Sequence, residues 1–285
     1  MRRSLLVFAT TAGLIPPFGA SVCGAPTSLH ASAPAAAPLA QESLSADERE
    51  QLRDLARRAE AELRTNILPF WLKHTRDRER GGFYGVIERD LKVRKDAPRG
   101  ALLTARILWT FSAAHRRYQD PEYRKMAQWA YDDLLNRFWD QENGGVLWTV
   151  KASGKPLEQR KQIYAQAFAL YGLTEYHRAT GDKVALDRAI AVFRLIEEHA
   201  YDREQGGYFE AFTRGWAVLP EGTRSVMDTE EPKSQNTMLH IMEAYTNLYR
   251  VWPDALLRRR LVELVDRMMT RVLDPNTKHL HLLLA

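Results

Sequence analysis

Residues 77–84 read Asp77-Arg78-Glu79-Arg80-Gly81-Gly82-Phe83-Tyr84, and this pattern decides the fold because it recurs. Residues 140–147 and 202–209 repeat its Asp-x-Glu-x-Gly-Gly core, and residues 274–280 form a degenerate fourth copy. Successive copies begin 63, 62 and 72 residues apart. Acidic side chains bond to turn backbone and glycine permits a positive φ, so each copy predicts a turn followed by a short strand-like stretch. Regular spacing of this length is typical of a repeat protein.

The sequence between the turns predicts helices. Ser45 and Glu48 form a capping box before the first helix, and Asp120-Pro121 is a typical helix start. Further helices are expected at 101–118, 157–179, 182–199, 230–251 and 254–273. We therefore expect an all-α array of about seven helices, built from hairpins stacked side by side. Such an array is either an open solenoid or a closed toroid around a pocket, and the Gly-Gly-aromatic loops favour the toroid.

The N-terminal segment is expected to lie outside the folded domain. Arg2 and Arg3 precede a mostly apolar run over residues 5–18, after which small residues follow. Residues 1–25 therefore predict an export signal, and the Pro-, Ala- and Ser-rich residues 26–44 predict a linker. We therefore expect the protein to be exported to the periplasm or secreted. If residues 1–25 are not a signal, the expected location is the cytoplasm.

Composition excludes several classes of protein. The chain has 285 residues, of which 45% are hydrophobic and 27% charged, and these values exclude collagen-like and wholly disordered proteins. The net charge of +5 falls to +3 without the two arginines of the expected signal, and the charges are scattered. We therefore expect no nucleic-acid partner and, since the apolar run is short, no membrane span. Cys23, the only cysteine, leaves a lipid anchor open.

Three segments of the sequence are similar to a known family, the N-acylglucosamine 2-epimerases. Residues 97–114, 161–168 and 232–253 resemble most closely the corresponding stretches of its cellobiose 2-epimerases. The resemblance runs from about residue 45 to the end. It implies an (α/α)6 barrel of twelve helices, and interconversion of sugars at C2 without a nucleotide or organic cofactor.

The resemblance also implies that residues 45–285 are the N-terminal part of such a barrel, with about seven of its twelve helices. In the family, later helices carry two further histidines, thought to transfer the protons, and these have no counterpart in this sequence. We expect a truncated or fragmentary chain that is a monomer or a weak homo-oligomer.

Arg106 is the first candidate catalytic residue. It lies on an otherwise apolar helix, where burying a guanidinium without a partner is costly. Arg106 either forms a structural ion pair between helices or binds a negatively charged oxygen of the substrate. The resemblance implies the second: Arg106 binds O1 of the open-chain sugar, or the enediolate oxygen that forms when the C2 proton is removed.

Asn236, His240 and Glu243 are spaced at i, i+4 and i+7 and so share one helix face. A lone histidine on such a helix is ordinarily a satisfied core residue. The resemblance implies instead that His240 is catalytic and that Asn236 binds substrate. We expect Glu243 to hold the tautomer of His240 or to contact a sugar hydroxyl.

Tyr164 and Asp228 are further substrate-binding candidates. Tyr164 either hydrogen-bonds a sugar hydroxyl or packs between helices, and Asp228 lies in the loop before a predicted helix. We expect no cofactor, because the sequence has no Walker loop and no dinucleotide-binding fingerprint. We expect no metal, because His279 and His281 lack a third ligand nearby.

The favoured hypothesis is therefore an epimerase that inverts C2 of the reducing-end glucose of β-1,4-linked disaccharides. An N-acylglucosamine 2-epimerase or a mannose/glucose isomerase is the nearest alternative. A glycoside hydrolase or polysaccharide lyase on the same toroid, and an inactive carbohydrate-binding remnant, are alternatives of other classes. A hydrolase needs two opposed carboxylates, and no such pair stands out.

Overall fold

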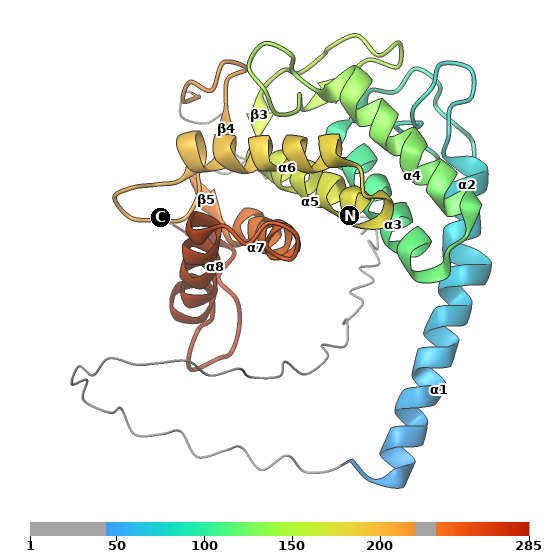
Figure 1. The fold of residues 1–285 in the computed structure, drawn as a ribbon, viewed down its shortest axis with the longest axis horizontal. Coiled ribbons are helices and arrows are strands. Elements are labelled where there is room, and N and C mark those ends of the chain that lie inside the picture. Colours follow the sequence, from blue (N-terminus) through green and yellow to red (C-terminus); the bar gives the residue numbers. More distant parts are fainter. Residues whose placement is uncertain (1–43, 220–231, 285) are drawn as a thin grey trace. The chain divides into compact units, whose positions relative to one another are not determined.

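The computed structural model describes residues 44–219 and 232–284, which are mostly helical (Figure 1). The described residues fall into two units, which divide between Asp54 and Leu55. In neither described range is any helix both long and apolar enough to cross a membrane.

The predicted capping box begins the first helix, α1 (Ala46–Glu62). The backbone N–H of Ser45 donates to the Glu48 carboxylate at 2.8 Å, and the N–H of Glu48 donates to the Ser45 hydroxyl at 3.2 Å. The helix continues through a π-helical turn, η1 (Leu63–Ile67), into α2 (Leu68–His74).

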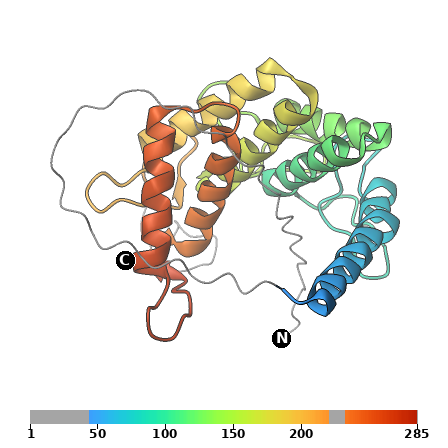
Figure 2. The ribbon, with the colours of Figure 1, turned by 60° about the horizontal axis from the view of Figure 1, so that its bottom comes forward.

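Three inner helices and three outer helices follow as hairpins. The inner helices are α3 (Ala101–Tyr118), α5 (Ile163–Thr180) and α7 (Gln235–Tyr249). The outer helices are α4 (Pro121–Asp133), α6 (Lys183–Leu195) and α8 (Ala255–Arg267), which end in the π-helical turns η2 (Leu134–Phe138), η3 (Ile196–Ala200) and η4 (Met268–Val272). Helix α5 packs between α3 and α7, and each inner helix packs against the outer helix that follows it (Figures 1 and 2). The described ranges thus hold seven continuous helices, as predicted.

Two predicted helix starts are wrong. The helix expected from residue 157 begins at Ile163, and the one expected from residue 230 begins at Gln235. In both cases the two residues before the helix are extended, because they pair with a strand of the next hairpin. The antiparallel pairs are β1 (Arg99–Gly100) with β2 (Thr149–Val150), β3 (Lys161–Gln162) with β4 (Ala211–Phe212), and β5 (Lys233–Ser234) with β6 (Leu283–Leu284).

The repeated Asp-x-Glu-x-Gly-Gly segments are tight turns, as predicted. In the second copy, Asp140 Oδ1 accepts the N–H groups of Glu142 and Asn143 at 3.1 and 3.3 Å. Gly144 and Gly145 have φ values of +69° and +68°, a conformation that glycine adopts without steric cost. The Asp140 N–H donates to the Gly145 carbonyl at 2.9 Å and closes the turn. The first, third and fourth copies close with the same backbone bond.

A buried cation connects each of the first three turns to the start of an inner helix. The Lys161 ammonium donates to Asp140 Oδ2 at 2.8 Å and to the Gly144 carbonyl at 2.7 Å, and both charged side chains are wholly buried. We call this arrangement the turn clamp. Its two other copies join Arg99 to Asp77 and Gly81, and Lys233 to Asp202 and Gly206.

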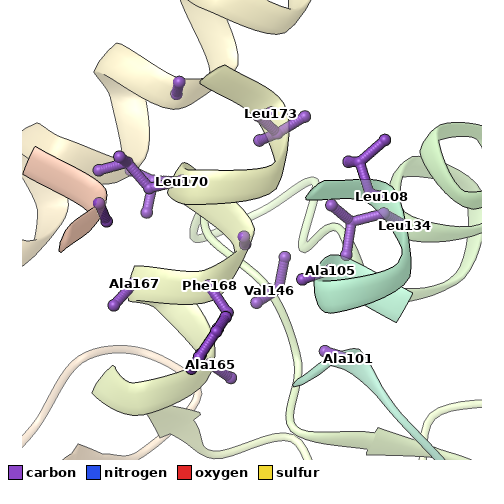
Figure 3. Packing of buried hydrophobic residues seen from close by; sticks show 14 of the residues in the cluster. Ala101, Ala105, Leu108, Leu134, Val146, Ala165, Ala167, Phe168, Leu170 and Leu173 are labelled. Atoms are coloured by element: carbon purple, nitrogen blue, oxygen red, sulfur yellow. The ribbon is translucent and has the colours of Figure 1, made fainter. Parts of the chain in front are cut away.

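Small residues bring the inner helices close together. Ala101, Ala105 and Leu108 of α3 are buried in the core against α5 (Figure 3). On α5, a Cβ at Gly172 would lie 2.7 Å from the Ala105 carbonyl oxygen. Only glycine allows this approach, so the α3–α5 distance is set by backbone contact.

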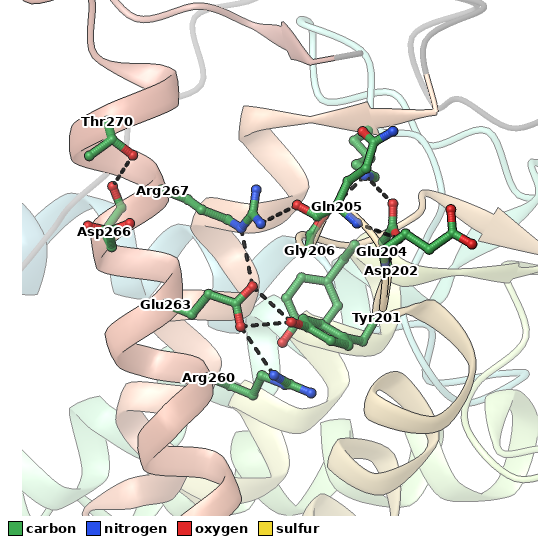
Figure 4. Close-up of polar contacts among 12 residues, drawn as sticks. Tyr201, Asp202, Glu204, Gln205, Gly206, Arg260, Glu263, Asp266, Arg267 and Thr270 are labelled. Atoms are coloured by element: carbon green, nitrogen blue, oxygen red, sulfur yellow. Dashed lines mark hydrogen bonds and ion pairs between the residues drawn. The ribbon is translucent and has the colours of Figure 1, made fainter.

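The outer helix α8 is tied to the turn of the preceding hairpin (Figure 4). Tyr201 donates to the Glu263 carboxylate at 2.9 Å, and the Arg260 guanidinium lies 3.4 Å from the centroid of the Tyr201 ring. Arg267 donates to Glu263 at 3.2 Å and to the backbone carbonyl of Gln205. These polar contacts fix consecutive hairpins to one another outside the apolar core.

Gly145→Ala is expected to destabilise the protein by about 3 kcal/mol, because the new Cβ would lie 2.6 Å from Gln166 Oε1. Gln166 holds the N–H and the carbonyl of Val146 at 2.8 and 2.7 Å, and both bonds would be disturbed. Gly181→Ala is the matched control: its φ is +76°, but no atom lies within 4 Å of the new Cβ. The control is expected to cost about 1 kcal/mol. If urea unfolding showed the same loss of unfolding free energy for Gly145→Ala and Gly181→Ala, the explanation by the Gln166 contact would be contradicted.

Asp202 is expected to stabilise the protein above pH 4 and to lose that effect in acid. Burial alone would raise the pKa of Asp202, but hydrogen bonds from Lys233 and from the N–H groups of Gln205 and Glu204 lower it to about 2, from 3.8. Because the pKa of Asp202 is lower in the folded than in the unfolded state, its ionisation stabilises the folded protein above pH 3.8. This stabilisation disappears as the pH falls toward 2. The difference in unfolding free energy between wild type and Asp202→Asn should therefore shrink over this window. The exposed Asp187→Asn serves as control, and a constant difference for Asp202→Asn would refute the expectation.

Candidate functional site

Two of the predicted site residues occupy equivalent positions in the repeat. The sixth residues of α3, α5 and α7 are Arg106, Phe168 and His240. The Arg106 guanidinium carbon lies 4.7 Å from the centroid of the Phe168 ring, and the Phe168 and His240 rings lie 4.6 Å apart. Phe168 therefore stands between the two predicted catalytic residues and holds both at one level of the inner face. The cation–π contact stabilises the position of the guanidinium.

The second residues of α5 and α7, Tyr164 and Asn236, form a layer beside this one. The Tyr164 ring meets the His240 ring edge to face, with centroids 4.9 Å apart, and the Tyr164 hydroxyl interacts with the Asn236 amide. Burial, together with the negative charges of Glu243 and Glu210, raises the pKa of Tyr164, although Arg106 and Asn236 oppose the shift. The phenol is therefore protonated at neutral pH and can donate a hydrogen bond.

His240 and Glu243 form a hydrogen-bonded pair. His240 Nδ1 lies 2.7 Å from Glu243 Oε2, and the imidazole side chain is only 6% exposed. An ionised carboxylate can only accept hydrogen bonds, so Nδ1 carries the proton and Nε2 of the neutral ring keeps its lone pair. The contact favours one tautomer of His240, which is one of the two roles predicted for Glu243.

A third layer lies at the ninth residues of the inner helices, Trp109, Tyr171 and Glu243. The Trp109 and Tyr171 rings lie 5.1 Å apart. Burial and the charges of Glu243 and Glu175 raise the pKa of Tyr171 to about 12. Phe168, Trp109 and Tyr171 were not predicted from the sequence to belong to the site. Counting residues from the start of each inner helix would have found them.

The structure thus brings together Arg106, Tyr164, Asn236, His240 and Glu243. Asp228 lies outside the described residues. Within the described ranges, no group of three or more His, Cys, Asp or Glu side chains could hold a metal ion. The arrangement supplies a positive charge, a proton acceptor and a phenolic donor on three adjacent helices. Such a set can bind a polyhydroxylated ligand and polarise a carbonyl oxygen or an oxyanion.

The chain is similar to proteins of known function. The sequence model of the family described as N-acylglucosamine 2-epimerase (GlcNAc 2-epimerase) matches residues 82–281. A cellobiose 2-epimerase of Bacteroides fragilis is 47% identical over 228 residues, which are 80% of this chain and 58% of the relative. The cellobiose 2-epimerase structure from Bacillus thermoamylovorans has a TM-score of 0.77 at 40% identity and that from Spirochaeta thermophila 0.78 at 38%. The matches cover 81% and 85% of this chain, and 59% of each structure.

Fold and site define an all-α protein of the (α/α)6 barrel type, with its polar site on the inner helices. The chain belongs to the N-acylglucosamine 2-epimerase family. It spans about 58% of the length of the Bacteroides fragilis relative.

Glu243→Ala is expected to release the tautomer of His240, because it removes the acceptor that fixes the proton on Nδ1. The imidazole ¹⁵N chemical shifts, assigned with His240→Gln, should change from an Nδ1–H pattern to a mixture of tautomers. Glu198→Ala, which removes an exposed glutamate on another helix, is the control and should leave the pattern unchanged. An unchanged pattern in Glu243→Ala would show that another group holds the ring.

Proposed function

We propose that this chain acts as a carbohydrate 2-epimerase that inverts C2 of the reducing-end glucose of β-1,4-linked disaccharides such as cellobiose. The observation that carries the proposal is the convergence of Arg106, the His240–Glu243 pair and the Tyr164–Asn236 pair on three adjacent inner helices. The relatives named cellobiose 2-epimerase support the substrate.

Epimerisation at C2 requires an open-chain aldose, a base that removes the C2 proton, and an acid that returns a proton on the other face. The resemblance assigns these two transfers to histidines of later helices, and the described residues supply the groups that bind the sugar, open its ring and stabilise charge. Between these steps negative charge gathers on O1 of the enediolate. A fixed positive charge beside O1 lowers the barrier, because it stabilises the intermediate more than the neutral carbonyl. Arg106 suits this role, since the Phe168 ring holds its guanidinium in place beside His240.

His240 suits proton transfer to or from the sugar oxygens. Its Nε2 lone pair can accept the proton of the anomeric hydroxyl as the C1–O5 bond breaks and C1 becomes the aldehyde. The imidazolium so formed is stabilised by Glu243 and can return the proton to the ring oxygen O5. Tyr164 and Asn236 then orient the sugar through its hydroxyl groups, with the phenol as donor and the amide as donor or acceptor. Asp228 remains a proposed substrate-binding residue on the basis of the sequence alone.

Two further points are part of the proposal. The chemistry assigned to these residues uses proton transfer and charge stabilisation, so we propose that the reaction needs no cofactor. We also propose that the protein is exported, because residues 1–25 have the pattern of a signal peptide.

Arg106→Ala is expected to lower kcat/KM by at least about 100-fold, the usual scale for loss of one oxyanion-stabilising group. The assay incubates the full chain with cellobiose in D₂O and follows deuterium at C2 and the glucosyl-mannose product by NMR. Arg117→Ala, an exposed arginine on the same helix, is the control and should retain wild-type activity.

Three outcomes would contradict the proposal. Cleavage of the disaccharide would indicate a hydrolase, and binding without exchange at C2 would indicate a carbohydrate-binding protein. Exchange confined to N-acetylated sugars or free mannose would contradict the substrate and leave the reaction standing.

A further inference from the structure

Glu210 occupies a position of the repeat at which only the backbone carbonyl has a structural role shared with the equivalent residues. It is the eighth residue after the turn aspartate, and its carbonyl accepts the N–H of Ile163, the first residue of α5, at 2.8 Å. The equivalent carbonyl of Trp148 accepts the first N–H of α3 at 3.1 Å, and that of Leu282 accepts the first N–H of α7 at 2.9 Å. Since tryptophan and leucine perform the same backbone task, the fold does not explain a carboxylate here.

The Glu210 side chain is buried, with the residue only 3% exposed. Its Oε1 accepts the backbone N–H and the hydroxyl of Ser234 at 3.0 and 2.8 Å, and its Oε2 contacts the Thr237 hydroxyl at 2.8 Å. The neighbouring Lys233 directs its ammonium to Asp202 and Gly206 instead. Burying a carboxylate without a contacting cation is costly, even when its hydrogen bonds are made.

Glu210 Oε1 is the acceptor in both hydrogen bonds with Ser234. The Ser234 hydroxyl accepts the N–H of Thr237 at 3.1 Å as the N-cap of α7, so its own proton points to Glu210. The carboxylate therefore extends the cap of α7 by one more acceptor and faces the positive end of the helix dipole.

Through these bonds Glu210 is connected to both helices that form the Tyr164–Asn236 layer. Ser234, the N-cap of α7, lies two residues before Asn236, and Thr237 follows Asn236 on the helix. Ile163 immediately precedes Tyr164 on α5. The backbone of Glu210 thus locates the start of α5, and its side chain locates the first turn of α7.

We infer that Glu210 is a positioning residue: its carboxylate fixes the first turn of α7 against the start of α5 and thereby holds the Asn236 amide at the Tyr164 hydroxyl. The inference rests on the proposed function for its effect on catalysis, but its structural part stands without it. The negative charge of Glu210 has a second effect, since it favours the protonated, donating form of Tyr164.

Several charged or titratable groups face Tyr164. Arg106 lies on α3, His240 and Glu243 lie on α7, and Glu210 directly precedes β4. Of the two carboxylates, only Glu210 lacks a basic or imidazole partner among the contacts of the described residues, because Glu243 is bonded to His240. Removing the charge of Glu210 therefore changes the electrostatics at Tyr164 without breaking another ion pair.

The decisive experiment uses the isosteric variant Glu210→Gln in the full chain labelled with ¹³Cζ-tyrosine. The glutamine Oε1 can keep both bonds from Ser234, and its amide can donate to the Thr237 hydroxyl, so the fold is expected to persist. The Tyr164 resonance, assigned with Tyr164→Phe, should titrate at lower pH than in wild type. Glu204→Gln, an exposed glutamate of the same hairpin, is the matched control and should leave the titration unchanged. An unchanged Tyr164 titration in Glu210→Gln would refute the electrostatic effect of Glu210, while its positioning role is tested by the kinetics below.

Kinetics supply the second readout. Glu210→Ala is expected to lower kcat/KM for epimerisation at least about tenfold by displacing Asn236, whereas Glu210→Gln should remain within about threefold of wild type. Wild-type kinetics in Glu210→Ala would overturn the positioning role. If Glu210→Ala does not fold, Glu210→Asp replaces it: the shorter side chain keeps the charge but withdraws the carboxylate from Ser234 and Thr237, so wild-type kinetics would overturn the positioning role. If the wild-type chain shows no epimerisation, the proposed function fails, while the titration in Glu210→Gln still tests the electrostatic effect of Glu210.

Discussion

The turn clamp is the interaction on which the remaining structure depends. One aspartate carboxylate serves two elements, because Oδ1 accepts the N–H groups of its own turn while Oδ2 accepts the cation of the strand before an inner helix. The same cation also donates to a glycine carbonyl of the turn. In the second copy both charged groups are thereby hydrogen-bonded, which is the condition under which a buried ion pair is tolerable in a protein interior.

The clamp fixes where each inner helix begins, and this position determines the site. The cation is followed by one further strand residue and then by the first residue of the helix, in all three copies. Equivalent residues of α3, α5 and α7 consequently lie at the same level. Arg106, Phe168 and His240 meet because each is the sixth residue of its helix, although 62 and 72 residues separate them along the chain.

The sequence predicts those features that depend on local spacing. The Asp-x-Glu-x-Gly-Gly turns and the common face of His240 and Glu243 follow from short-range rules, and the structure shows both. The contact of Arg106 with Phe168 depends instead on register between helices, which is set by two-residue strands too short to give a pattern of alternation. For the same reason the predicted starts at residues 157 and 230 are wrong. Phenylalanine also carries no chemical signal that would separate a site residue from a core residue.

Comparison of equivalent positions in the repeat distinguishes residues that the fold requires from residues that the fold does not explain. Where the clamp requires an aspartate, a glycine or a basic residue, all three copies conform. At the sixth helix position the residues are arginine, phenylalanine and histidine. At the eighth position after the aspartate of the second, third and fourth turns they are tryptophan, glutamate and leucine. Stability alone does not favour a partly buried guanidinium or a buried carboxylate at positions where other copies carry apolar residues. Arg106 and His240 lie on the inner helices α3 and α7, and Glu210 contacts the first turn of α7, so the proposed chemistry of this site accounts for their cost.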